Sequence, residues 1–195
     1  MNQQFTPPSA SLVGIGGRRY NGAAQALHWL TALLMFAVLP LAWVMVSVAR
    51  DNPSRDALFT LHKSIGMTIL ALTIVRLVWR GANPVPAFPA RLSRWETVPA
   101  KLSHWLLYLI LLVMPISGYV LSAASGHPVT FFGLFEFPSL PQNKLLAQLA
   151  VDVQLLTQWV VYALIALHIL ATTWHILLRR DAVLDRMLPE QRNAE

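Results

Sequence analysis

Three long stretches without Asp, Glu, Lys or Arg dominate the sequence. They cover residues 20–49, 102–135 and 153–178 and are 30, 34 and 26 residues long. A helix needs about 20 apolar residues to cross the hydrocarbon of a bilayer. Only 12% of all residues are charged and 55% are hydrophobic, whereas soluble domains carry about 25% charged residues. The sequence therefore predicts an integral membrane protein and excludes a soluble globule.

Four transmembrane helices are expected, at residues 24–48, 57–79, 102–124 and 153–178. Lys63 and Arg76 interrupt the second one near its ends, where long basic side chains can extend to water. Four antiparallel helices with short links form an all-α bundle, and side chains that face the interior of such a bundle can hold a cofactor.

The segments outside the spans are assigned by composition. A flexible N-terminal arm is expected at residues 1–17, the four-span domain at 18–189 and a short tail at 190–195. The connection at 80–101 contains four prolines. It is predicted to be a non-helical loop, because proline lacks the backbone N–H that a helix interior needs.

Basic residues outside the spans lie mostly on one side of the membrane. Ten fall on the side of the two termini, and three, Arg50, Arg55 and Lys144, fall on the other side. The positive-inside rule then predicts that both termini are cytoplasmic. The net charge of +6 reflects this orientation rather than binding of nucleic acid.

Five of the six histidines fall in or at the edge of the expected spans. Ionisable side chains in hydrocarbon are costly and normally face the bundle interior. At the helical rise of about 1.5 Å per residue, His28 lies about 13 Å and His168 about 16 Å from the cytoplasmic edge. Two imidazoles from different helices at one height meet the requirement for axial ligation of one b-type haem iron.

His62 belongs to another layer, about 27 Å from the cytoplasmic edge. A second haem there needs a partner fourteen residues before His168, because fourteen residues are close to four helical turns. That position is Gln154, and an amide is a poor iron ligand beside imidazole. The spacing therefore supports one haem with two histidine ligands, and does not support a second.

Three further polar residues are expected at the cytoplasmic rim. His175 follows His168 by seven residues on nearly the same face, Arg76 follows His62 by fourteen, and His104 begins the third span. We expect this cluster to pair with haem propionates or to hydrogen-bond a quinone headgroup.

Other redox and hydrolytic sites find no support in the sequence. Cysteine is absent, which excludes disulfides, Cys-ligated iron–sulfur clusters and the covalent attachment of c-type haem. The sequence also contains no H-E-x-x-H motif and no Walker loop.

The ordered set of motifs resembles the bacterial cytochrome b561 family, which shares its fold with the b-type cytochrome subunits of nickel hydrogenases. The resemblance covers about residues 18–189. The matching segments, in chain order, are 26–30 (ALHWL), 61–66 (LHKSIG), 75–76 (VR), 104–108 (HWLLY), 114–118 (MPISG), 167–168 (LH), His175 and 179–189 (RRDAVLDRMLP).

The resemblance implies a four-helix cytochrome of the bacterial inner membrane, typically with two b haems. It assigns the inner haem to His28 and His168, and the outer haem to His62 and the position of Gln154. Here Gln154 replaces the fourth histidine of the family. The outer haem is then lost, or held by His62 with a weak or absent sixth ligand, or completed by His127 from the outer loop.

The resemblance also implies electron transfer between a donor on one side of the membrane and the quinone pool. One characterised type in the family oxidises superoxide at the outer face and reduces ubiquinone. Here Arg50, Arg55, Lys63 and Lys144 would attract that anion. Two other functions stay open: a haem-bearing membrane anchor that relays electrons from a partner redox enzyme, and a non-redox four-span protein with degenerate haem sites. No catalytic residue is assigned.

Overall fold

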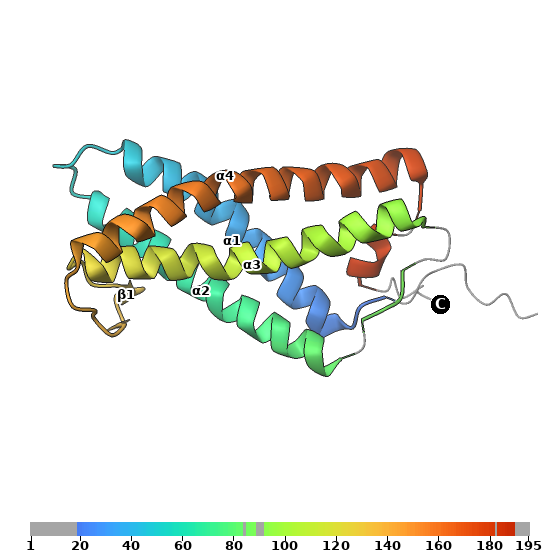
Figure 1. Cartoon of the computed structure of the whole chain (residues 1–195), viewed down its shortest axis with the longest axis horizontal. Helices are drawn as coiled ribbons and strands as arrows, with labels where there is room; N and C mark the ends of the chain where they lie inside the picture. The colour runs from blue at the N-terminus through green and yellow to red at the C-terminus, as the bar shows by residue number, and fades with distance from the viewer. Residues whose placement is uncertain (1–18, 84, 89–91, 182, 190–195) are drawn as a thin grey trace, which may run out of the picture.

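Four long helices make up most of the protein in a computed structural model that describes residues 19–83, 85–88, 92–181 and 183–189 (Figure 1). They are α1 (Gly22–Ser47), α2 (Arg55–Ala82), α3 (Arg94–Ala124) and α4 (Lys144–Trp174). Each of these helices is long and apolar enough to cross a membrane. The prediction of an all-α, four-span membrane bundle is thereby confirmed. The expected arm at residues 1–17 and the tail at 190–195 lie outside the described residues.

The helices alternate in direction, so their termini gather at two ends of the bundle (Figure 1). α1 packs on α2, α2 on α3, and α3 on α4. The N/C end, as we call it, holds the start of α1 and the end of α4. The opposite end is the hairpin end, because it holds the short strands β1 (Thr130–Phe131) and β2 (Phe135–Glu136).

α3 is longer than expected. It begins at Arg94 rather than at residue 102, and α2 continues to Ala82, so the prediction of a non-helical loop at 80–101 is wrong for residues 80–82 and 94–101. Ser93 and Glu96 form a capping box in which the Ser93 backbone N–H donates to the Glu96 carboxylate at 2.8 Å. Such a box starts a helix whether or not its first turns are apolar. Pro99 lies in the second turn, where it removes one backbone hydrogen bond without ending the helix.

α4 also begins earlier than expected, at Lys144 rather than at residue 153. The Asn143 side chain accepts a hydrogen bond from the Leu146 backbone N–H at 3.0 Å, which is a helix N-cap. Hydropathy detects the part of a helix that lies in hydrocarbon, whereas the cap sets where the helix begins. The first turns of α4 therefore extend beyond the apolar stretch.

Contacts between neighbouring helices form a small core. It consists of two clusters, Val38 with Ile65 and Ile69 between α1 and α2, and Ile110 with Val161 and Leu164 between α3 and α4. Large apolar side chains on the outside stay uncovered, and Leu33 and Leu156 are 65% and 68% exposed. Such an apolar exterior suits helices that are surrounded by lipid.

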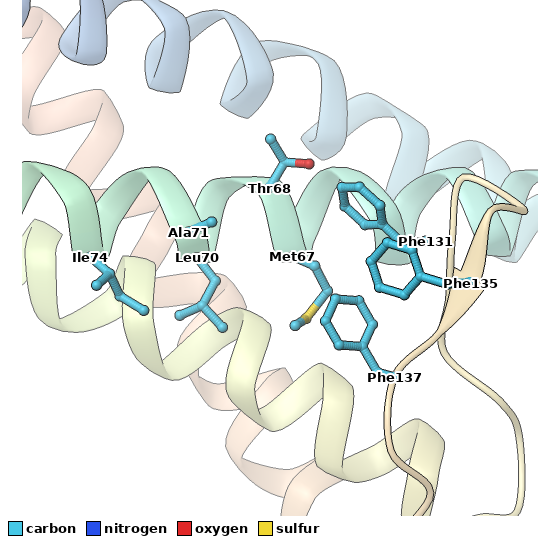
Figure 2. A pocket seen from close by; sticks show the side chains of 8 residues that line it. All are labelled: Met67, Thr68, Leu70, Ala71, Ile74, Phe131, Phe135 and Phe137. Atoms are coloured by element: carbon cyan, nitrogen blue, oxygen red, sulfur yellow. The ribbon is translucent and has the colours of Figure 1, made fainter.

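A short hairpin that was not expected covers the hairpin end of α2. Its strands pair antiparallel with Phe131 opposite Phe135, and Gly133 takes the left-handed turn conformation with φ 76°. Phe131, Phe135 and Phe137 point toward Met67 and line an apolar pocket of about 280 Å³ against α2 (Figure 2). The phenylalanines thus extend the apolar surface of α2.

Hydrogen bonds of the Ser64 side chain connect this hairpin to α2. Its side chain is fully buried and accepts a hydrogen bond from the Phe132 backbone N–H at 2.8 Å. The same hydroxyl donates to the Thr60 carbonyl within α2 at 2.7 Å.

Replacing this hydroxyl is expected to loosen the hairpin. Ser64→Ala leaves the Phe132 N–H without an acceptor, and an unsatisfied buried donor costs about 1–3 kcal/mol. We expect a lower midpoint of thermal unfolding in detergent and faster protease cleavage within residues 128–137. Ser103→Ala is the control, because the Ser103 hydroxyl donates to the Ala100 carbonyl of its own helix. Equal effects of the two substitutions would show that Ser64 does not hold the hairpin.

Candidate haem site

His28 of α1 and His168 of α4 face each other in the half of the bundle near the N/C end. Their ring centres are 6.3 Å apart and their planes are inclined by 57°. An imidazole nitrogen coordinates a metal at about 2 Å and lies about 1 Å from its ring centre, so two rings that bracket one metal lie about 6 Å apart. The observed separation fits this requirement.

Two histidines alone do not hold a bare metal ion. Within the described parts of the chain, no three side chains of the types His, Asp and Glu gather closely enough to do so. A porphyrin supplies four nitrogens in one plane and leaves two axial positions for protein ligands. The paired imidazoles therefore suit a haem better than a structural metal centre.

A third imidazole lies beside the pair. The ring centre of His104 on α3 is 5.6 Å from that of His168, and the planes are inclined by 65°, so the rings meet edge to face. The spacing analysis placed His104 at the start of its span, in a rim cluster with His175 and Arg76, and not beside His168. The structure brings it into direct contact with a candidate ligand, where it can orient the ring of His168.

Arg76 of α2 also belongs to this group. Its Nη2 lies 3.3 Å from Nδ1 of His28, and its guanidinium stacks over the Tyr108 ring at 5.3 Å. A neutral imidazole that binds a metal through one nitrogen keeps its proton on the other. Nδ1 of His28 would then be a donor and cannot accept a hydrogen bond from Arg76. The guanidinium would require another acceptor, and a haem propionate is one.

His175 is not part of this group. Its Nδ1 lies 2.7 Å from a carboxylate oxygen of Asp181. It opens the π-helical turn η1 (His175–Arg179), with which the last long helix ends. Next to it, Arg179 pairs with Glu96 of α3 at 2.9 Å. Of the three residues expected at the rim, Arg76 and His104 thus join the imidazole pair, whereas His175 has an acidic partner of its own.

His62 and Gln154 lie toward the hairpin end, each with different neighbours. Nδ1 of His62 is buried and has no hydrogen-bond partner in the described structure. The Gln154 side-chain oxygen accepts a hydrogen bond from the Ser117 hydroxyl at 2.6 Å. Its amide group lies over Gly118, where an added Cβ would come within 3.6 Å of it. Gln154 is therefore anchored to α3.

His127 does not supply the missing imidazole. It is exposed in the loop after α3, where its backbone N–H donates to the Ser122 carbonyl at 2.9 Å. His62 thus has no second histidine beside it in the structure, but its unpartnered buried nitrogen remains available to a ligand.

Residue spacing did not identify Arg186 as a candidate site residue. The sequence analysis included it only among the ten basic residues on the side of the two termini. It lies in the 3₁₀ helix η2 (Leu184–Met187), drawn in red at the N/C end (Figure 1). Its side chain is only 6% exposed. No pattern within the sequence signals this burial, because it arises from contacts with segments about 100 and 160 residues away.

Comparisons with known proteins agree with this geometry. Residues 19–190 match the family described as prokaryotic cytochrome b561. The chain is 31% identical over 171 residues to cytochrome b561 homolog 2 of Escherichia coli strain K12, which covers 87% of this chain and 91% of the relative. It is 28% identical over 177 residues to the probable superoxide oxidase CybB of Yersinia pestis, which covers 90% of this chain and 98% of that protein.

A further relative, cytochrome b561 homolog 1 of Escherichia coli strain K12, is 25% identical over 178 residues, which are 89% of this chain and 99% of the relative. The family match spans all four helices and every candidate ligand. The chain therefore belongs to the prokaryotic cytochrome b561 family, and it is a bacterial membrane cytochrome of the b type.

Proposed function

We propose that this protein transfers electrons between a donor at the hairpin end and a membrane quinone, through one b haem bound by His28 and His168. The observation that carries the proposal is the 6.3 Å separation of these two rings on different helices. Bound haem supplies an iron that exchanges one electron between its ferrous and ferric forms. The chain supplies ligation, orientation and exclusion of water.

Each polar residue around the pair has a separate role in this proposal. His104 orients His168 by its edge-to-face contact. Arg76 lies beside His28 and neutralises a propionate. His175, paired with Asp181, lies nearest the N/C end and offers a proton-carrying group to a quinone headgroup. We place the N/C end in the cytoplasm, in accordance with the excess of basic residues there.

Superoxide is the donor that we propose. The support comes from the relative named a probable superoxide oxidase and from two exposed cations at the hairpin end, Arg50 and Lys144, which lie there among the exposed carboxylates of Asp51, Asp56, Glu136 and Asp152. Two superoxide anions lose one electron each and become dioxygen. One quinone takes up the two electrons with two protons and becomes the quinol.

Removing both ligands is expected to abolish the haem signal. In the His28→Ala, His168→Ala double variant both proposed ligands are lost, so the reduced-minus-oxidised b-type spectrum of the purified protein should disappear. His127→Ala is the control, because His127 is exposed in a loop and should keep the full spectrum. A normal spectrum in the double variant would end the proposed function.

Gln154→His is expected to create a second haem site. It places an imidazole fourteen residues before His168, and His62 already offers an unpartnered buried nitrogen. We expect the haem content to rise from one to two per chain. Gln148→His makes the same substitution at an exposed position of the same helix and should leave the content at one. Two haems in the unaltered chain would contradict the single-haem proposal.

Superoxide oxidation should depend on charge at the hairpin end. A cationic surface raises the encounter rate with an anion, and salt screens this attraction. We expect Arg50→Glu combined with Lys144→Glu to lower kcat/KM for superoxide several-fold at low ionic strength and to reverse its salt dependence, because salt then screens a repulsion. Unchanged salt dependence would exclude superoxide steering by these residues. Haem content should stay unchanged in this variant.

Two other roles predict different outcomes of the same measurements. A haem-bearing anchor for a partner enzyme would bind haem but would not reduce quinone with superoxide as the sole donor. A non-redox protein would contain no haem. Haem content and quinone reduction by the isolated chain therefore separate the three roles.

A further inference from the structure

The C-terminal segment around η2 docks on the first two turns of α1 (Figure 1). The indole N–H of Trp29 donates to the Met187 carbonyl at 2.7 Å, and the Gln25 amide donates to the Leu188 carbonyl at 2.9 Å. Gln25 and Trp29 lie one turn apart on α1, and His28 lies between them in sequence. The segment therefore covers α1 at the level of the candidate ligand.

Arg186 is the most deeply buried side chain of this segment. Its guanidinium donates to the carbonyls of Pro86 and Ala87 at 2.7 and 3.1 Å. The rings of Tyr20 and Phe88 lie 5.6 and 5.5 Å from the guanidinium carbon. Its Nε is buried and has no hydrogen-bond partner in the described structure. Backbone carbonyls and ring faces thus surround a full positive charge.

A buried cation without an anionic partner is unfavourable, because burial removes the solvation of the charge. Within the described ranges, the two ion pairs are His175 with Asp181 and Arg179 with Glu96. Neither of them includes Arg186. The two carbonyl groups accept hydrogen bonds from Nη2 only and do not neutralise the charge, whereas Nε has no partner in the described structure. An anion would satisfy both the free donor and the charge.

The charge of Arg186 acts on the imidazole group. Arg76, Arg80 and Arg186 all lie within electrostatic range of the His104 ring. Arg76 and Arg80 also stack over the same ring, that of Tyr108, at 5.3 and 5.9 Å. The charges of three guanidinium groups thus act on His104 at the N/C end, and no acidic side chain pairs with any of them in the described structure.

We propose that Arg186 is a positioning residue that binds a carboxylate of the cofactor between His28 and His168. Haem b carries two propionates, and Arg76 and Arg186 would each hold one. The bond fixes the segment 184–189 over α1, and the fixed positive charge raises the reduction potential because it favours the form with the additional electron. This inference rests on the proposed function of the His28 and His168 pair.

The test is a redox titration of the purified full-length protein. Arg186→Met keeps the bulk of the side chain and removes its charge. We expect the equilibrium constant of haem reduction to fall about tenfold, which lowers the midpoint potential by about 59 mV for a one-electron couple. Arg186→Lys retains the charge and should keep most of the potential, which loss of packing alone would not explain.

Resonance Raman spectra give a second readout that does not depend on activity. The propionate bending mode reports hydrogen bonding to the carboxylate, and it should shift in Arg186→Met but not in Arg50→Met. Arg50 is an exposed cation at the opposite end, so its removal should leave the midpoint potential unchanged. If the methionine variant does not accumulate, Arg186→Gln serves, because its amide can still donate to the Pro86 carbonyl.

Two outcomes would overturn the inference. One is a normal potential and propionate mode in Arg186→Met. The other is a rise in potential of similar size in Glu190→Gln, which would identify a carboxylate of the chain itself as the anion that neutralises Arg186; Glu190 lies outside the described residues. Absence of haem from the unaltered protein would instead refute the proposed function, so the two failures are distinguishable.

Discussion

Burial of imidazole and guanidinium groups in an apolar bundle is the constraint on which the arrangement depends. A polar atom inside hydrocarbon must find a partner, and the described spans offer His28, His104 and His168 no carboxylate. Acidic partners lie only at the N/C end, where Asp181 and Glu96 pair with His175 and Arg179. The imidazoles of His28, His104 and His168 therefore contact one another and are available to bind a ligand. A haem iron that takes one imidazole from each side would satisfy both His28 and His168, whose ring centres are 6.3 Å apart.

The two ends of the bundle satisfy their polar groups differently. At the hairpin end, the Ser117 hydroxyl donates to the Gln154 side-chain oxygen and the Phe132 N–H donates to Ser64, both within the chain. Nδ1 of His62 is the exception there, because it has no partner among the described residues. At the N/C end, Arg186 keeps its charge unneutralised among carbonyls and aromatic rings. Internal satisfaction stabilises a fold without a ligand, whereas unneutralised buried charge requires one. A haem bound by His28 and His168, as proposed, would therefore contribute more to the stability of the N/C end than to that of the hairpin end.

Sequence reasoning succeeded for features that depend only on position along the chain. Charge-free stretches located three of the four helices, and the second was assigned despite Lys63 and Arg76. Counting residues along the helices placed His28 and His168 at similar heights, in agreement with the 6.3 Å between their ring centres. Height says nothing about the direction in which a side chain points between helices, so the contact of His104 with His168 could not be derived. The starts of α3 and α4 were missed because caps at Ser93 and Asn143, rather than hydropathy, determine them. Burial of Arg186 and the hairpin on Ser64 arise from contacts distant in sequence, which periodicity does not report.

Gln154 shows how a single position divides the two layers of the bundle. With histidine there, His62 would have an opposing imidazole in a layer separate from that of His28 and His168. Electrons could then pass through two haem sites on their way across the membrane. With glutamine, the side chain turns to Ser117 and lies over Gly118, while His62 keeps a buried nitrogen without a partner. An amide satisfied inside the chain gains little by binding iron. A single haem near the N/C end then lies far from a donor at the hairpin end, so the rate of the first electron transfer, rather than quinone reduction, would limit turnover.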